Sequence, residues 1–67
     1  MTELTINGRV QSFAQPLNVN ELLRELDLVN KRIAIERNGE IIPRSQFDSR
    51  ALENGDKLEI VVAVGGG

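Results

Sequence analysis

The chain has 67 residues, with ten acidic and eight basic side chains, a net charge of −2, and neither cysteine nor histidine. A domain of this length buries only about 60% of the surface of its unfolded chain, which limits it to one small core. Without Cys and His the sequence excludes disulfides, thiolate or imidazole catalysis, and zinc sites of the usual ligand types. We therefore expect one domain over residues 1–67, without a catalytic or metal site of its own.

The first predicted element is a β-hairpin around Asn7-Gly8, the first of three Asn-Gly pairs in the sequence. An Asn-Gly pair supplies the two residues of positive φ that a tight hairpin turn requires. The segments before and after it, ELTI (residues 3–6) and RVQSF (residues 9–13), have the composition of strands.

An amphipathic helix is predicted next, over residues 17–26, LNVNELLREL. Asn18 is the expected N-cap, and Glu21, three residues later, completes a capping box. Apolar residues follow the i, i+3, i+4, i+7 spacing of one helical face: Val19, Leu22, Leu23 and Leu26. This face should pack on the core.

A second hairpin joins residues 32–37, RIAIER, to residues 40–42, EII, through Asn38-Gly39. Pro43 should end the returning strand, since proline has no N–H to donate to a ladder. Residues 46–56, QFDSRALENGD, have no clear period and are expected to form a loop with one short helical turn. Phe47 and Leu52 would anchor this loop to the core.

The last strand, KLEIVVAV (residues 57–64), is the most apolar segment of the chain. Its residues alternate between two faces, with Leu58, Ile60, Val62 and Val64 on one and Glu59, Val61 and Ala63 on the other. A strand that is apolar on nearly both faces usually lies in the middle of a sheet, here beside the first strand and parallel to it.

Hairpin, helix, hairpin and central last strand together predict an α+β domain of the β-grasp, or ubiquitin-like, fold. The sheet would be mixed, with four to five strands, and the helix would lie across one face. We expect the core to consist of the helical face together with Leu4, Ile6, Ile33, Ile35, Leu58 and Ile60.

Charge and hydropathy limit the partners. The basic residues are scattered except for Lys31-Arg32, and no cluster of them is interleaved with aromatic residues, which disfavours nucleic acid. No apolar run is long enough to span a bilayer, and the N-terminus is not typical of a signal peptide. We expect a cytoplasmic protein that is monomeric when free and does not contact membranes.

Several segments resemble the ThiS family, the sulfur carriers of thiamine biosynthesis: VNELLREL, IAIERNGEIIPRSQ and ALENGDKLEIVVAVGGG. The resemblance covers nearly the whole chain. It implies that an ATP-dependent, ThiF-type adenylyltransferase activates the carboxylate of Gly67 as an acyl-adenylate. A cysteine desulfurase relay would then deliver sulfur, and the resulting thiocarboxylate would serve a ThiG-type thiazole synthase. No cofactor would be bound, because ATP is used by the partner enzyme.

The resemblance also assigns roles near the end of the sequence. Gly65 and Gly66 would form a flexible segment over residues 65–67, narrow enough to enter the enzyme's cleft because glycine lacks Cβ. The outer face of the last strand, with Glu59, Val61 and Ala63, would supply the docking energy together with Val64 near the exit of the strand. No role follows for Arg44.

Two alternatives share an activated C-terminus and differ in what receives it. One is the small, sulfur-donating subunit of molybdopterin synthase, and the other is a ubiquitin-like modifier of protein lysines. Only the family resemblance favours the sulfur carrier over them.

Overall fold

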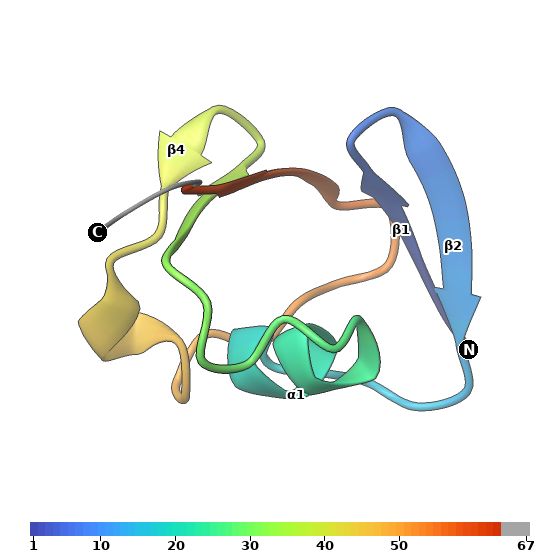
Figure 1. Cartoon of the computed structure of the whole chain (residues 1–67). Helices are drawn as coiled ribbons and strands as arrows, with labels where there is room; N and C mark the ends of the chain where they lie inside the picture. The colour runs from blue at the N-terminus through green and yellow to red at the C-terminus, as the bar shows by residue number, and fades with distance from the viewer. Residues whose placement is uncertain (64–67) are drawn as a thin grey trace.

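The computed structural model describes residues 1–63, in which a five-stranded sheet lies over one α-helix (Figure 1). The strands are β1 (Thr2–Ile6), β2 (Arg9–Phe13), β3 (Ile33–Arg37), β4 (Glu40–Ile41) and β5 (Lys57–Val62), in the order β2-β1-β5-β3-β4. β5 is parallel to β1 and antiparallel to β3. The predicted mixed sheet, with the last strand inserted beside the first, is confirmed.

Two of the three Asn-Gly pairs form the predicted hairpin turns. Asn7 and Gly8 have φ of 50° and 84°, and Asn38 and Gly39 have φ of 50° and 89°. These left-handed conformations suit the right-handed twist of the paired strands. The third pair differs, because Gly55 has a φ of 90° while Asn54 keeps an ordinary negative φ.

The helix α1 (Val19–Glu25) begins at the predicted cap. Asn18 Oδ1 accepts a hydrogen bond from the backbone N–H of Glu21 at 2.7 Å, and Glu21 Oε1 accepts one from the backbone N–H of Asn18 at 2.8 Å. The capping box is therefore confirmed. Leu22 and Leu23 are buried, whereas Leu26 lies just past the helix, caps its C-terminal end and is half-buried.

The core lies between the sheet and α1 and is formed by Leu4, Ile6, Val19, Leu22, Leu23, Ile35, Ile42, Phe47, Leu52, Leu58 and Ile60. Ile33 was expected among them but is only half-buried, because it pairs with Val62 at the margin of the sheet. Ile42 was not expected. Its backbone N–H donates to the carbonyl of Ile35 at 2.9 Å, which draws the residue inward after β4 ends.

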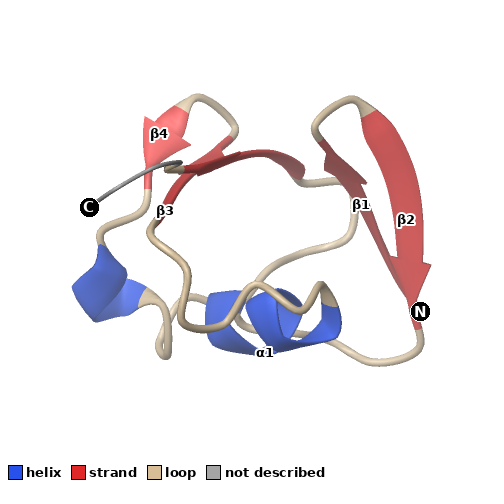
Figure 2. Ribbon diagram, viewed as in Figure 1, coloured by secondary structure: helices blue, strands red, loops and turns tan. Residues whose placement is uncertain are grey.

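The expected helical turn lies earlier than the sequence suggested. It is the 3₁₀ helix η1 (Arg44–Gln46), which directly follows Pro43 (Figure 2). The proline carbonyl accepts from the backbone N–H of Gln46 at 2.9 Å, and its fixed φ of −64° prepares this start. Phe47 and Leu52 anchor the following loop to the core as predicted.

An ion pair holds the turn that leads into β5. Arg37 Nε lies 2.8 Å from Asp56 Oδ2, with side-chain exposures of 18% and 8%. This approach is a charge contact, because the Nε–H group makes no hydrogen bond of acceptable geometry. Asp56 instead accepts hydrogen bonds from the backbone N–H of Glu53 and from Asn38 Nδ2, at 2.8 and 3.2 Å. One carboxylate thus joins the turn before β5 to the second hairpin.

Candidate functional site

β5 leads directly to the segment in which the sequence placed the functional residues. Ala63, the last described residue, donates its backbone N–H to the carbonyl of Arg32 at 2.9 Å and so extends the pairing with the β3 side by one residue. The predicted site residues Val64, Gly65, Gly66 and Gly67 lie outside the described residues. The described part of the candidate site is therefore the platform from which this segment leaves the sheet.

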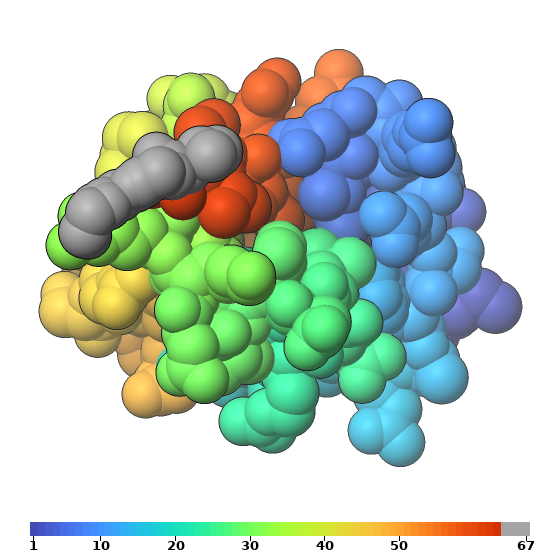
Figure 3. All heavy atoms as spheres, viewed as in Figure 1, coloured from blue at the N-terminus to red at the C-terminus, as the bar shows by residue number. Residues whose placement is uncertain are grey.

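The two faces of β5 differ as predicted. Leu58 and Ile60 are buried against the core, at 2% and 7% exposure, whereas Val61 is 60% exposed and Glu59 is also exposed. Ala63, just after the strand, is exposed as well. Figure 3 shows residues near the C-terminal end of β5, in red, at the surface of the molecule. Three of the four predicted partner-binding residues thus lie where a partner can reach them.

Neighbouring strands extend this surface. Val61 is paired with Ala34 of β3, Glu59 is paired with Glu36 of β3, and Glu36 is paired in turn with Ile41 of β4. Residues paired across strands place their side chains on the same face. We call the resulting surface the outer patch; it consists of Ala34, Glu36, Ile41, Glu59, Val61 and Ala63. The contributions of β3 and β4 were not predicted from the sequence. Counting alternate residues outward from the Asn38-Gly39 turn would have indicated them.

Two carboxylates oppose each other in the outer patch. Glu36 and Glu59 are directly paired across β3 and β5, an arrangement of like charges that weakens a sheet. Among residues 1–63, both ion pairs are made by Arg37, with Glu53 and Asp56, so neither Glu36 nor Glu59 has a cationic partner there. The outer patch therefore combines exposed apolar side chains with uncompensated negative charge.

The hairpin turns fix the position of β5 from both sides. Asn7 Oδ1 accepts from the backbone N–H of Ile60 at 2.8 Å, while its Nδ2 donates to the carbonyl of Ile60 at 3.1 Å. Asn38 Oδ1 accepts from the backbone N–H of Lys57 at 3.0 Å. The two carboxamides thus hold β5, the platform for the following segment, beside both hairpin turns.

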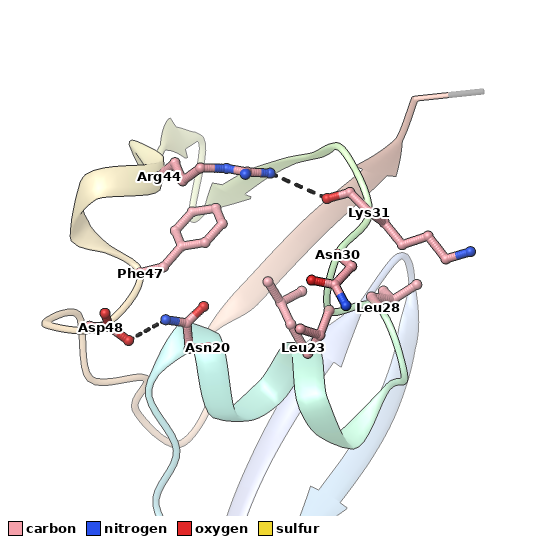
Figure 4. A pocket seen from close by; sticks show the side chains of 9 residues that line it. Asn20, Leu23, Leu28, Asn30, Lys31, Arg44, Phe47 and Asp48 are labelled. Carbon is pink, nitrogen blue, oxygen red and sulfur yellow. Dashed lines mark hydrogen bonds between the residues drawn. The ribbon is translucent and has the colours of Figure 1, made fainter. Parts of the chain in front are cut away.

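A hollow of about 340 Å³ opens between α1, η1 and the loop before β3, away from the outer patch (Figure 4). The side chain of Arg44 lies along the upper side of this hollow, and its Nη2 donates a hydrogen bond to the carbonyl of Lys31 at 3.2 Å. Asn20 Nδ2 donates a hydrogen bond to the carboxylate of Asp48. The side chains of Arg44, Asn20 and Asp48 thus join parts of the chain to one another. This finding gives Arg44 a structural role that the sequence did not reveal.

The described residues offer neither a metal site nor a membrane-spanning helix. Residues 1–63 contain no group of three or more His, Cys, Asp or Glu side chains arranged to hold a metal ion. In the same part of the chain, no helix has the length and apolar character needed to cross a membrane.

The arrangement of the sheet and the helix defines the class of protein. A five-stranded mixed sheet with a central last strand and one helix across a single face is the ubiquitin-like β-grasp fold. A crystal structure of the thiamine biosynthesis protein ThiS from Geobacter metallireducens matches it with a TM-score of 0.83 and 36% identity, over 98% of this chain and all of that chain.

The sequence narrows the class to a family. The ThiS family model matches residues 3–67, and this chain belongs to the ThiS family of sulfur carriers. It is 35% identical to the sulfur carrier protein ThiS of Bacillus subtilis, over 96% of this chain and 98% of that protein. It is also 45% identical, over 97% of its length, to part of a thiazole synthase from Paramagnetospirillum magneticum, of which it spans only 20%.

Proposed function

We propose that the chain carries sulfur as a thiocarboxylate on Gly67 and donates it to thiazole formation in thiamine biosynthesis. The observation that supports this most strongly is the family match, because it runs through the glycine segment to residue 67. The protein then acts as a co-substrate of its partner enzymes. ATP is consumed by the adenylyltransferase, and the carrier itself holds no cofactor.

The proposed chemistry begins with activation, because a carboxylate is a poor electrophile. Attack of the Gly67 carboxylate on the α-phosphorus of ATP gives an acyl-adenylate and pyrophosphate. A persulfide sulfur from the desulfurase relay then displaces AMP at the carbonyl carbon, and reductive cleavage of the resulting acyl disulfide by a thiol leaves the thiocarboxylate. Gly65 and Gly66 give access, since a Cβ at either position adds bulk in a narrow cleft.

Docking of the folded domain provides the binding energy in this proposal. Ordering a chain of glycines costs conformational entropy, so contacts elsewhere must offset that cost. The outer patch is suited to this role because Val61 and Ala63 lie immediately before the carrier segment. Glu59 and Val64 are the other two proposed contacts. The adenylyltransferase and the thiazole synthase would use the same patch in turn.

Reconstitution with the adenylyltransferase, ATP and a sulfur donor tests the proposal. The expected result is release of pyrophosphate and a mass increase equal to the exchange of one oxygen for sulfur on the carrier. Deletion of Gly67, or addition of one residue after it, should abolish both signals. The same residue added before Met1 is the matched control and should have no effect. Normal thiocarboxylate formation on the extended chain would contradict the proposal.

The acceptor distinguishes the alternatives. A thiocarboxylate that loses its sulfur on incubation with thiazole synthase and its substrates supports the proposal. Loss of sulfur only to a molybdopterin synthase large subunit, or an isopeptide bond to protein lysines, would favour one of the two other functions. The partial match to a thiazole synthase supports the first acceptor, since in that relative a similar domain is part of the same polypeptide.

A further inference from the structure

The three Asn-Gly pairs differ in the contacts that protect them, and this difference has a chemical consequence. In an Asn-Gly sequence the glycine amide nitrogen can attack the asparagine side-chain carbonyl, because no side chain on glycine hinders the approach. We propose that Asn54-Gly55 is a site of spontaneous deamidation and isoaspartate formation in the folded protein. The other two pairs, Asn7-Gly8 and Asn38-Gly39, react only when the sheet unfolds.

The proposed reaction is balanced without an oxidant or reductant. The Gly55 amide nitrogen, after losing its proton to hydroxide, bonds to Asn54 Cγ. The Cγ–Nδ2 bond breaks, and the nitrogen leaves as ammonia. Water then opens the five-membered succinimide at either carbonyl, which gives aspartate or an isoaspartyl linkage at position 54. The reaction requires that both the side-chain carbonyl and the Gly55 nitrogen are free to meet.

In the folded chain a single residue holds both reactants. The backbone N–H of Glu3 donates to Asn54 Oδ1 at 2.7 Å, and the backbone carbonyl of Glu3 accepts from the Gly55 N–H at 2.7 Å. Loss of these two contacts therefore exposes the electrophile and the nucleophile together. No second element is bonded to this pair of reacting groups among residues 1–63.

Because of the position of Glu3, these two hydrogen bonds can break while the rest of the sheet stays folded. Glu3 lies near the N-terminal end of β1 and faces Ser12 of β2 on its other side, so the first hairpin stays paired when the turn moves away. Asn54 and Glu3 are both exposed, and the hydrogen bond between them lies at the surface. Chain ends and exposed turns open with much smaller free energies than central strands.

The other two pairs are held by the central strand and, for Asn38, also by Asp56 just before it. Asn7 bonds through both side-chain atoms to the backbone of Ile60, and its own N–H donates to the carbonyl of Leu58 at 2.9 Å. Asn38 bonds to Lys57 through its side chain and through its backbone N–H, and to Asp56 through Nδ2. Freeing either side chain requires separation of a hairpin from β5, which lies between β1 and β3.

The product should disturb the structure because Asp56 lies directly after the turn. An isoaspartyl linkage at position 54 adds one carbon to the backbone two residues before Asp56. The carboxylate of Asp56 holds Arg37, Asn38 and the N–H of Glu53. The longer backbone should misplace that carboxylate, whereas an ordinary aspartate at position 54 retains an oxygen for the Glu3 N–H.

Incubation of the intact folded chain at mildly alkaline pH, followed by peptide mapping, tests the proposal. We expect deamidation at Asn54 at least tenfold faster than at Asn7 or Asn38, and comparable rates at all three in a fully denaturing concentration of urea. Below the unfolding transition, the Asn54 rate should depend only weakly on urea, while the other two rates should follow global unfolding. Equal rates in the folded protein, or an Asn54 rate that follows global unfolding, would overturn the proposal.

Variants separate the turn contact from general stability. Glu3→Pro removes the donor to Asn54 and should accelerate deamidation at that site alone, provided circular dichroism shows a native fold. Asn54→Asp, the matched control for the product, should melt within a few degrees of the unmodified chain, whereas the isoaspartyl form should melt lower. Acceleration at all three sites in folded Glu3→Pro, or an isoaspartyl form as stable as the Asp variant, would contradict the proposal.

Discussion

The carboxamide of Asn7 pairs with both the N–H and the carbonyl of Ile60, at 2.8 and 3.1 Å, and so continues the contact between β1 and β5 after β1 has turned away. β1 itself pairs with β5 only at Thr5 and Ile6. One side chain therefore takes the place of a further residue of strand. The position of β5, and of the segment after it, depends on this contact.

Substitution of Asn7 by glycine tests the contact without straining the turn. Glycine adopts the φ of 50° found at this position, so Asn7→Gly removes the side chain without straining the turn. Leaving the part-buried Ile60 groups without partners should lower the free energy of unfolding by about 1–3 kcal/mol. Urea denaturation measures this value. The control is Arg9→Ala, next to the turn, which leaves the turn intact. Gly8→Ala is unsuitable because alanine disfavours the φ of 84° at position 8. A loss below that of Arg9→Ala would show that the contact is not stabilising.

Leu23→Ala should destabilise the domain severely. Leu23 is 5% exposed and lies on the core face of α1, so the cavity should cost about 2–5 kcal/mol. If the free energy of unfolding of the whole domain is about 5 kcal/mol, such a loss approaches global unfolding. Thermal melting is the measurement. Glu21→Ala on the same helix should be mild, because the Asn18 side chain still caps the N-terminus; equal losses would contradict the assignment of the core face.

A charge in the outer patch should impair docking and leave the fold intact. Val61 and Val10 are both exposed valines, at 60% and 62%, on strands of the same sheet, and only Val61 lies in the outer patch. We expect Val61→Asp and Ala63→Asp to raise the KM for adenylation at least tenfold, or about 1.4 kcal/mol, because an apolar partner surface leaves the charge without a hydrogen bond.

Val10→Asp is the matched control for the docking variants and should leave the KM unchanged. Titration against the adenylyltransferase and against the thiazole synthase, with circular dichroism for folding, shows whether both enzymes use the patch. Unchanged affinity of folded Val61→Asp and Ala63→Asp for both enzymes would remove the patch from the docking surface.

The paired carboxylates of the outer patch allow opposite effects on stability and binding. Glu59→Gln relieves repulsion with Glu36 and should raise the free energy of unfolding by up to about 1 kcal/mol. If a partner places a cation over this pair, the same variant should bind more slowly and with a weaker salt dependence. Glu25→Gln, an exposed acid on α1, is the control. Stopped-flow association at two salt concentrations measures the association rate and its salt dependence. An unchanged rate would exclude a contribution of this charge to association.

Patterns within short segments predicted most of the fold. The spacing of Val19, Leu22 and Leu23 located α1, the Asn18–Glu21 pair located its start, and Asn7-Gly8 and Asn38-Gly39 located both hairpins. These features depend on local geometry, which a single sequence contains. The apolar character of residues 57–64 predicted that the last strand lies in the middle of the sheet, and β5 lies there, between β1 and β3.

Features that no periodicity marks were not predicted. Ile42 is buried beyond the end of β4, where its N–H donates to the carbonyl of Ile35 across the hairpin. The helix η1 begins directly after Pro43 and not where the sequence suggested. Arg44 is explained by the carbonyl of Lys31, a partner that no spacing in the sequence indicates. For the candidate site, the sequence predicted which face of β5 is exposed, but not that Ala34, Glu36 and Ile41 extend it, because strand register decides which residues lie beside β5.

The most direct test of the proposed function is the mass of the protein isolated from thiamine-starved cells, followed by fragmentation of its C-terminal peptide. We expect a fraction of molecules heavier by one sulfur-for-oxygen exchange, with the sulfur on Gly67 and sensitive to alkylation. This fraction should disappear in cells that lack the adenylyltransferase. A chain found only as the free carboxylate in cells that contain that enzyme, or a sulfur on any other residue, would contradict the proposed function.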